Sequence, residues 1–349
     1  MASKWKNALA VISLCVRLGS GAYAEANDSG GFHLSDPAVY ENLAIYFVHG
    51  KSRGGPVPLT LQEALDKKAI VVSETGEVNE LRIENTGGEA VFIQSGDIVK
   101  GGKQDRVLSV SLLLPPHSGA IPIDAFCVES GRWSARGSED ARTFSSANAD
   151  LPSRAAKLEM ADALVPKPDG TAAPLGARQQ QIWESVEKIK GKLSGNLGAP
   201  VAAPQSQSSL ELALENHRLA GEQEKYVAAL QAKGEQGDDV VGYVFAVNGK
   251  VDGGDVYPSN GLFRKMWPKL LRASVTEAIS ERDASKATPP PVDAVNGFVA
   301  DAEKSKAVET RTREQTLVGV RESPGVMSLE TRPADAPASA WIHRSYIAK

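Results

Sequence analysis

Residues 240–257 read VVGYVFAVNGKVDGGDVY, and they give the clearest local structural signal in the chain. Two runs rich in apolar residues, Val240–Val247 and Lys250–Val256, flank the dipeptide Asn248-Gly249. Asn-Gly favours the type I′ turn that closes two-residue hairpins, because both turn positions require a positive φ. The stretch therefore predicts a β-hairpin, and with it an antiparallel sheet in the C-terminal half.

Helices and further strands are expected on both sides of this hairpin. Residues 262–279 carry apolar side chains at the spacing of an amphipathic helix that lies on a sheet, and Pro268 is expected to kink this helix or to mark its start. The other elements expected in this half are helices over Gln179–Lys192, from a Ser208/Glu211 capping box to about Gln231 and near Val292–Lys304, and strands Thr316–Val320, Val326–Glu330 and Trp341–Ile347.

The N-terminal half reads mainly as short strands between Gly, Asn and Asp turns. One helix interrupts them, because Thr60 and Glu63 form a capping box before a run of good helix formers. Closely spaced strands of this kind predict an antiparallel sandwich or an open barrel. The expected strands are Leu43–Val48, Ile70–Ser73, Glu80–Glu84, Ala90–Ile93, Val107–Leu114 and Ala120–Val128.

These elements predict an α+β protein. Residues 25–133 form an antiparallel β-rich, sandwich-like or barrel-like part, and residues 178–349 form a helix-plus-hairpin part that packs on the first. Residues 134–177 are rich in Ala, Ser, Asp, Pro and Gly with little periodicity, so we expect a long loop or linker there. The two parts are expected to make one continuous domain over residues 40–349.

Residues 1–24 have the pattern of a cleavable secretory signal peptide. Positive charge, an apolar stretch and a small-x-small cleavage site follow one another at Lys4 and Lys6, Ala8–Val16 and Ala22–Ala24. An ordinary buried N-terminal helix is the competing interpretation. If the segment is cleaved, the protein is exported to the periplasm or the extracellular space. Cleavage also removes Cys15 and leaves Cys127 without a disulfide partner, so a hydrophobic core must hold the fold together.

The composition excludes several classes of partner. A formal net charge of −4 provides no basic surface for a nucleic acid. Beyond the N-terminus no apolar run approaches the roughly 18–20 residues that cross a bilayer, so no integral membrane segment is expected after signal cleavage. The five histidines never fall at i, i+2 or i, i+4, and no P-loop, GxSxG, HExxH or GxGxxG pattern is present. We therefore predict no dedicated metal site and no cofactor.

The loop at residues 96–106 concentrates Gly, basic and amide residues. Backbone N–H groups together with Lys103, Gln104 and Arg106 are suited to hold an anion. The competing interpretation is a tight turn at Gly101-Gly102 with solvated charges.

A second polar cluster, Cys127-Val128-Glu129-Ser130-Gly131-Arg132-Trp133, follows a predicted strand. Strand alternation places Cys127 and Glu129 on one face, as a candidate nucleophile and a candidate base. The planar fork of Arg132 suits a carboxylate or a phosphate. The alternatives are a small buried thiol, a strand-ending Glu–Arg pair and Trp133 as a core anchor.

A third polar cluster ends the chain at residues 341–346. It offers His343 as a general base or orienting group and Arg344 as a ligand-binding residue. The alternative for His343 is an ordinary hydrogen-bonded histidine of the surface or core.

Six segments carry a likeness to a known family. They are Leu59-Thr60-Leu61-Gln62-Glu63-Ala64, Asn79-Glu80-Leu81, Gly102-Lys103-Gln104-Asp105-Arg106, Cys127-Val128-Glu129-Ser130-Gly131-Arg132-Trp133, Trp267-Pro268-Lys269-Leu270-Leu271 and His343-Arg344-Ser345-Tyr346. In these segments the chain resembles the ARG-and-rhodanese-phosphatase-superfamily-associated protein domain family. The resemblance implies a shared fold more than a shared reaction, because the name records an association with ADP-ribosylglycohydrolase-like and phosphatase-like proteins. Asp97 and Asp105 stand where the pattern has Glu and Asn, so no role is carried over to either.

Three hypotheses for function follow. The first is an exported protein that binds a small anionic molecule through Lys103, Gln104, Arg106, Glu129 and Arg132. The second is a hydrolase or transferase that uses Cys127 or Glu129. The third is a structural or interaction protein of the cell envelope.

Overall fold

The hairpin at residues 240–257 forms as predicted and lies near the middle of a large sheet. Strands β13 (Val240–Val247) and β14 (Lys250–Val256) pair antiparallel, with a bulge between Phe245 and Ala246. Asn248 and Gly249 have φ values of 51° and 74°, as a type I′ turn requires. Every residue of β13 is buried, because helices cover both faces of the sheet at this point.

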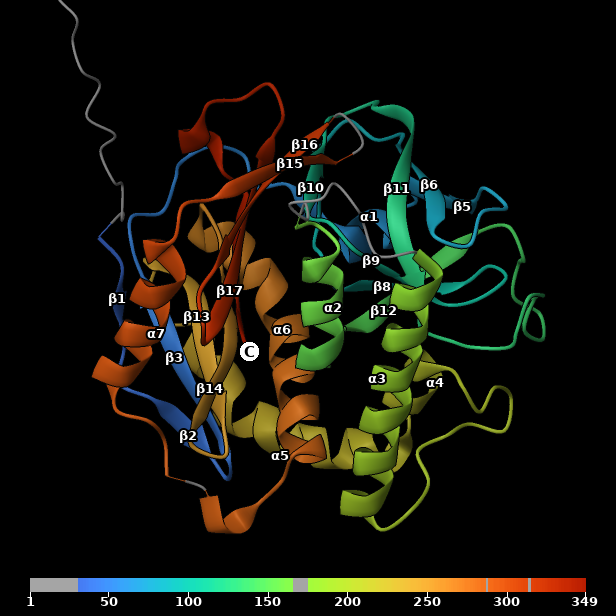
Figure 1. The fold of residues 1–349 in the computed structure, drawn as a ribbon. Helices are drawn as coiled ribbons and strands as arrows, with labels where there is room; N and C mark the ends of the chain where they lie inside the picture. The colour runs from blue at the N-terminus through green and yellow to red at the C-terminus, as the bar shows by residue number, and fades with distance from the viewer. Residues whose placement is uncertain (1–30, 166–174, 287, 313–314) are drawn as a thin grey trace, which may run out of the picture.

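The structure is a computed structural model, and it describes residues 31–165, 175–286, 288–312 and 315–349. Its largest sheet has nine strands in the order β1-β3-β13-β14-β18-β17-β16-β15, with β2 also paired to β3 (Figure 1). Every pairing in this sheet is antiparallel. The remaining strands of the sheet are β1 (His33–Leu34), β2 (Ala38–Tyr40), β3 (Leu43–His49), β15 (Val308–Thr312), β16 (Thr316–Glu322), β17 (Val326–Pro333) and β18 (His343–Ala348).

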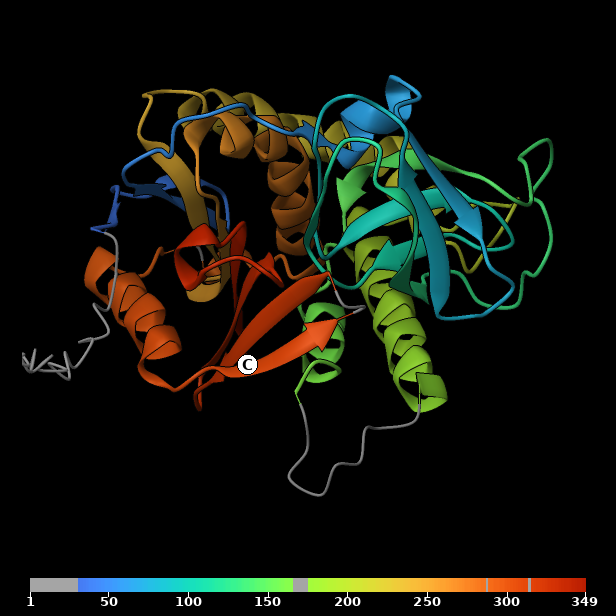
Figure 2. The ribbon, with the colours of Figure 1, turned by 90° about the horizontal axis from the view of Figure 1, so that it is seen from above.

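Helices cover the two faces of this sheet, and β3 shows how the sequence provides for both. Ile45 and Phe47 belong to the core cluster that contains helix α6 (Asn260–Ser280), whereas Tyr46 and Val48 pack with helix α7 (Val292–Lys304). Seen from above, α6 lies between the large sheet and the second half of the molecule (Figure 2). The helix expected near Val292–Lys304 is confirmed.

The other part of the molecule, built from the strands between residues 59 and 150, is barrel-like. A six-stranded sheet has the order β12-β8-β9-β11-β6-β5, and a bridge between Ser73 and Thr143 joins its two ends. The sheet is therefore nearly closed. A three-stranded sheet of order β10-β7-β4 and helix α1 pack against it. The elements are β4 (Leu59–Thr60), α1 (Leu61–Asp66), β5 (Ile70–Glu74), β6 (Glu80–Asn85), β7 (Val91–Ile93), β8 (Asp97–Gly101), β9 (Arg106–Leu108), β10 (Leu112–Leu114), β11 (Gly119–Cys127) and β12 (Phe144–Asp150).

The predicted fold class, α+β with a barrel-like N-terminal part and a helix-plus-hairpin C-terminal part, is confirmed. So is the capping box at α1, in which the Thr60 side chain accepts from the Glu63 N–H and the Glu63 carboxylate accepts from the Thr60 N–H. The helices that complete the second half and its junction with the first are α2 (Arg154–Asp162), α3 (Leu175–Leu197), α4 (Leu210–Leu214) and α5 (His217–Gly234).

The expectation that residues 134–177 form a long loop is wrong in part. Strand β12 closes the barrel-like sheet within this stretch, and helix α2 follows it. The sequence Phe144–Asp150 is poor in β-branched residues, so its strand depends on pairing with β8 and not on local propensity. Ser153 caps α2 by accepting from the Ala156 N–H.

Three smaller expectations also need correction. The strand expected over Val107–Leu114 is two strands, β9 and β10, because the chain leaves the barrel sheet at Ser109–Ser111 and joins another. The helix expected from Ser208 starts one residue later, with Ser209 as its cap, and is interrupted at Asn216. Pro268 lies inside α6 and does not mark its start, since the helix is buried along most of its length and packing offsets one missing hydrogen bond.

The proposed signal peptide, residues 1–24, lies outside the described residues. Within the described part of the chain, no helix is both long enough and apolar enough to cross a membrane.

Candidate functional site

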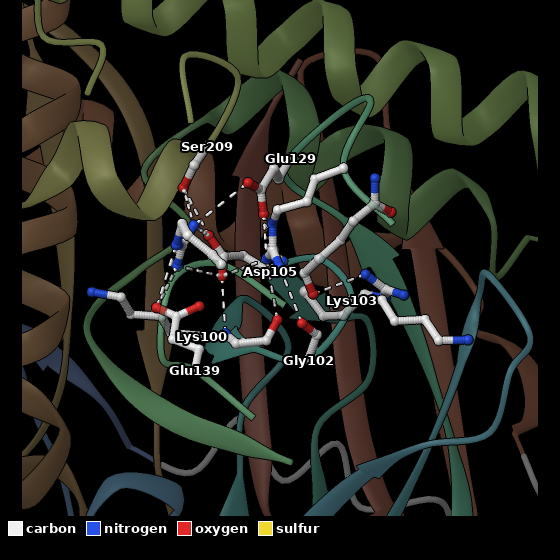
Figure 3. A network of polar contacts seen from close by, with 12 residues as sticks. Lys100, Gly102, Lys103, Asp105, Glu129, Glu139 and Ser209 are labelled. Atoms are coloured by element: carbon white, nitrogen blue, oxygen red, sulfur yellow. Dashed lines mark hydrogen bonds and ion pairs between the residues drawn. The ribbon is translucent and has the colours of Figure 1, made fainter. Parts of the chain in front are cut away.

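The two N-terminal clusters singled out in the sequence meet in one buried network of charges, which we call the arginine–carboxylate network: Asp105, Glu129, Arg132 and Arg136 (Figure 3). Asp105 accepts from both terminal nitrogens of Arg136, at 3.0 and 3.2 Å, and from the Ser209 hydroxyl at 2.7 Å. The Oδ1 atom of Asp105, which accepts from Nη2 of Arg136, also accepts from the Gly101 N–H at 3.0 Å. The Asp105 carboxylate is thus fully engaged inside the protein.

Glu129 is engaged in the same way. One of its oxygens accepts from Arg132 at 2.6 Å and from the Asp105 N–H at 3.1 Å, and the other lies 3.5 Å from Arg136. Burial alone would raise the pKa of Glu129, but hydrogen bonds and the positive charge of Arg132 outweigh it and hold the pKa below its usual value. The carboxylate is therefore charged and paired, which makes it a poor general base.

Gly102 allows the loop from β8 to β9 to form the floor of this network. It has a φ of 54°, and a Cβ there would lie 2.3 Å from the ring of Phe144. Its carbonyl accepts from Arg132 at 3.0 Å. The predicted turn at Gly101-Gly102 is present, but the neighbouring charges of Asp105 and Arg106 are buried and not solvated as that interpretation assumed.

Of the two basic residues of this loop proposed to hold an anion, Lys103 is partly exposed and Arg106 is buried. The Arg106 side chain is fully buried, donates to the Gln104 carbonyl at 2.9 Å and lies 3.5 Å from Glu74. The Lys103 ammonium lies 4.9 Å from the centre of the Trp133 ring, which is 44% exposed. Trp133 is therefore not the core anchor that the sequence suggested.

Cys127 is buried next to this network, at the end of β11. Burial raises the pKa of its thiol to about 11, although the charge of Arg106 opposes this. The Gln179 side chain bonds both the N–H and the carbonyl of Cys127, at 2.9 and 2.8 Å. The thiol is protonated at neutral pH and shielded from solvent, which are not the properties of a nucleophile.

His343 lies away from the network, in a second cluster that we call the serine–histidine pocket. This cluster consists of Ser111, His343, Asp255 and Lys157. The Ser111 hydroxyl lies 2.9 Å from Nδ1 of His343, and Nε2 of the same ring lies 3.1 Å from a carboxylate oxygen of Asp255. The three residues come from the β9–β10 connection, the start of β18 and strand β14. They form a continuous relay from hydroxyl to imidazole to carboxylate.

Neighbouring hydrogen-bonding groups determine where the protons of this relay lie. The Ser111 oxygen accepts from the Ser95 N–H at 2.9 Å, so its own proton is available to His343 Nδ1. Burial would raise the pKa of Asp255, but hydrogen bonds from His343 and Ser345 and the charges of His343 and Lys157 hold it below its usual value. An ionised Asp255 can only accept, so Nε2 of His343 carries a proton, and when the ring is uncharged Nδ1 accepts from the Ser111 hydroxyl.

Aromatic rings fix the orientation of the imidazole. The His343 ring stacks on Tyr257, with ring centres 5.2 Å apart and planes inclined by 27°, and the centre of the Phe92 ring lies 5.9 Å away with the two planes inclined by 69°. Only small movements of the ring are compatible with this packing.

A pocket opens beside the relay, between one face of the large sheet and helix α2. It encloses about 470 Å³ of empty space, part of it open to solvent. The Lys157 ammonium lies 3.4 Å from the buried Asp150 carboxylate, whose pKa burial raises to about 6. The lining residues are Ser95, Ser109, Val110, Ser111, Lys157, Ala161, Leu164, Asp255, Val318, Leu329, Thr331, His343, Ser345 and Ile347.

Arg344 does not join the pocket. Strand alternation turns it to the opposite face of the sheet, where it donates to Glu330 at 2.7 Å and lies 4.6 Å from the centre of the Trp341 ring. Of the eight site residues proposed from the sequence, His343 alone reaches the pocket, while the other six besides Arg344 gather in or beside the network. No group of three or more His, Cys, Asp or Glu side chains among the described residues is arranged to hold a metal ion.

Sequence reasoning missed Ser111, Asp255 and Lys157. The first lies in a stretch that reads as a continuous strand, and the second lies in a hairpin whose signal is purely structural. Neither is part of a local motif. The one available clue is that Ser111 and Asp255 are polar residues within predicted strands.

The fold and this pocket define an α+β protein that combines a nine-stranded antiparallel sheet with a nearly closed barrel-like sheet. The chain belongs to the ARG and Rhodanese-Phosphatase-superfamily-associated Protein domain family, whose model matches residues 31–347. The match confirms the resemblance seen in the sequence. No curated protein and no solved structure matches the chain.

Proposed function

We propose that this protein is a serine hydrolase of small esters or related acyl compounds, in which Ser111 is the nucleophile. The carrying observation is the relay of Ser111, His343 and Asp255 at the wall of a pocket. A hydroxyl is a weak nucleophile until an adjacent base takes its proton, and a third group that orients the base completes the arrangement. Lone hydrogen bonds of a serine are common, but the three-part relay beside a cavity is what this chemistry needs.

The first half of the reaction forms an acyl-enzyme. Ser111 Oγ attacks the carbonyl carbon of the substrate, and its proton passes to Nδ1 of His343. The imidazolium that forms is stabilised by the ionised Asp255 at Nε2. When the tetrahedral intermediate collapses, the bond to the leaving alkoxide breaks and the leaving oxygen takes the proton from Nδ1.

Water completes the second half. It attacks the acyl carbon while Nδ1 of His343 accepts one of its protons, and Ser111 Oγ leaves and recovers that proton. The overall reaction converts an ester and water to a carboxylic acid and an alcohol. The two ring nitrogens have exchanged places relative to the usual triad, in which the serine contacts Nε2, but either nitrogen of a neutral imidazole can accept a proton when the other carries one.

Labelling with a fluorophosphonate tests the proposal directly. We expect adduct formation at Ser111, located by peptide mass spectrometry, and turnover of p-nitrophenyl acetate that Ser111→Ala lowers by about a thousandfold or more. Ser118→Ala is the matched control, because it removes a hydrogen-bonded hydroxyl from the same half of the molecule but not from the pocket. Labelling elsewhere, or unchanged turnover in Ser111→Ala, would overturn the assignment.

A second candidate function is the binding of a small anion at Lys103. The supporting observation is that Lys103 is partly exposed beside the Trp133 ring, whereas Arg106 and Arg132 donate to protein oxygen atoms. Phosphate is expected to raise the melting temperature of the protein and not that of Lys103→Ala. Equal shifts in both would remove this candidate.

We also propose that the protein acts outside the cytoplasm after removal of residues 1–24. The support is the order of positive charge, apolar stretch and small-x-small site in the sequence. N-terminal sequencing of the protein from its native cell should begin at Glu25. A retained N-terminus would contradict export by this route.

A further inference from the structure

The pocket wall changes from polar to apolar along the sheet, and this gradient follows from strand register. In one row across four strands, Asp255 of β14 faces Ser345 of β18, Ser345 faces Leu329 of β17, and Leu329 faces Val320 of β16. In the neighbouring row His343 faces Thr331, which in turn faces Val318. The polar relay therefore lies toward the middle of the sheet, and the apolar side chains lie toward its edge.

Helix α2 and the residues after it complete the apolar end. Ala161 and Leu164 line the pocket there together with Val110 and Val318, and all four belong to or pack on one hydrophobic cluster. Leu164 and Leu329 are only partly buried, so the apolar end retains surface that a ligand can still cover. Such a surface beside a reactive hydroxyl suits the hydrocarbon part of a substrate better than a charged part.

We infer that the substrate of the proposed hydrolase carries a short apolar acyl chain, which runs from Ser111 along β17 and β16 toward Leu164. This inference rests on the proposed function for the identity of the reacting bond, and on the register and lining for the acyl chain. The space beside the relay is small, since the volume that water-sized molecules can enter is about 30 Å³. The class is therefore short-chain acyl esters and not long-chain lipids.

A chain-length series of p-nitrophenyl esters, from acetate to laurate, tests the inference. We expect kcat/KM of the full-length chain to rise about three- to fourfold per methylene up to the chain length that fills the apolar end, and then to fall. Leu164→Trp should lower kcat/KM for the ester of optimum chain length at least tenfold while leaving the acetate within about twofold, and Leu164→Ala should move the optimum to a longer chain.

Leu158→Ala and Leu158→Trp are the matched controls. Leu158 lies on α2 and packs on the same hydrophobic cluster, but it does not line the pocket. The controls should keep the chain-length profile of the original protein. If the profile is flat, or if it moves equally in both pairs of variants, the acyl-chain inference is wrong while serine hydrolysis stands.

A binding measurement tests the acyl-chain inference without relying on the proposed hydrolysis. Methyl ketones keep the carbonyl and the chain but have no leaving group, so their binding needs no catalysis. In Ser111→Ala, calorimetry should show tighter binding of 2-octanone than of 2-butanone, and Leu164→Trp should abolish the difference. If no ester is hydrolysed and no label is found, the proposed function fails, and equal ketone affinities would overturn the acyl-chain inference independently.

Discussion

The arginine–carboxylate network and the serine–histidine pocket are both built from buried polar side chains, but they differ in where their hydrogen bonds lead. In the network Asp105 and Glu129 accept from Arg132, Arg136 and backbone N–H groups, so both carboxylates are paired with donors of the protein itself. In the pocket the relay ends on a hydroxyl at a cavity wall. A cluster whose charges pair with one another fixes structure, whereas a cluster with one group directed at a cavity is able to act on a ligand.

The largest expected effect is on the relay. Asp255→Asn should lower kcat for ester hydrolysis by about a thousand- to ten-thousandfold, because an amide can donate to Nε2 of His343 and so favours the tautomer whose Nδ1 cannot accept the serine proton. Asp252→Asn is the matched control, since this carboxylate bonds Arg154 and not His343. Equal losses of kcat in the two variants would show that the contact of Asp255 with His343 has no specific role in catalysis.

The network should respond in stability and not in turnover. Arg136→Met leaves two buried carboxylates short of a partner and should lower the free energy of unfolding by about 3–5 kcal/mol, measured by denaturant titration. Turnover per folded molecule should stay within about threefold. Arg142→Ala provides the baseline, because its side chain is 88% exposed and the change should cost under about 0.5 kcal/mol. A cost below about 1 kcal/mol for Arg136→Met would contradict a structural role.

The two regions should also depend on pH with opposite sign. Asp150 beside the pocket has a pKa raised to about 6 against 3.8 for the ordinary side chain, so its contribution is present below pH 3.8 and is lost as pH rises through 6. Glu129 has a lowered pKa, so its contribution is present above the ordinary value of 4.5 and is lost as pH falls through its folded pKa.

Replacing each carboxyl by its amide should reveal these signs. Relative to the parent protein, Asp150→Asn should gain roughly 2–3 kcal/mol of unfolding free energy between pH 4 and pH 7, and Glu129→Gln should lose stability over the same change of pH. Chemical denaturation at a series of pH values measures both. Changes of the same sign would mean that the two regions are not electrostatically distinct.

The smallest effect is expected at Cys127. Its buried thiol, with a pKa of about 11, should resist iodoacetamide at pH 8 until the protein is unfolded. Cys127→Ala should change turnover by less than about twofold and stability by about 1 kcal/mol, because only a small apolar volume is lost. Rapid alkylation of the folded protein with loss of turnover would show that Cys127 is the nucleophile. The proposed difference between the two regions would then be wrong.

Much of the candidate site could not have been predicted from the sequence, for a physical reason. Local clustering of Lys, Arg, Glu and Gly around residues 96–106 and 127–133 signals chemistry, but adjacent opposite charges also satisfy one another most easily. The relay residues are separated by 144 and 88 positions, from Ser111 to Asp255 and from Asp255 to His343. Only His343 carried a signal of its own, because histidine is a frequent general base.

The sequence by itself determined the elements whose energetics are local. The Asn248-Gly249 turn requires positive φ at both residues, the Thr60 and Glu63 side chains cap the helix that starts beside them, and the helix at Val292–Lys304 follows from its pattern. Tertiary structure alone decided that β12 closes the barrel-like sheet and that Ser111 meets His343. Those contacts depend on strand register and on the packing of two halves of the chain, which no local pattern of residues encodes.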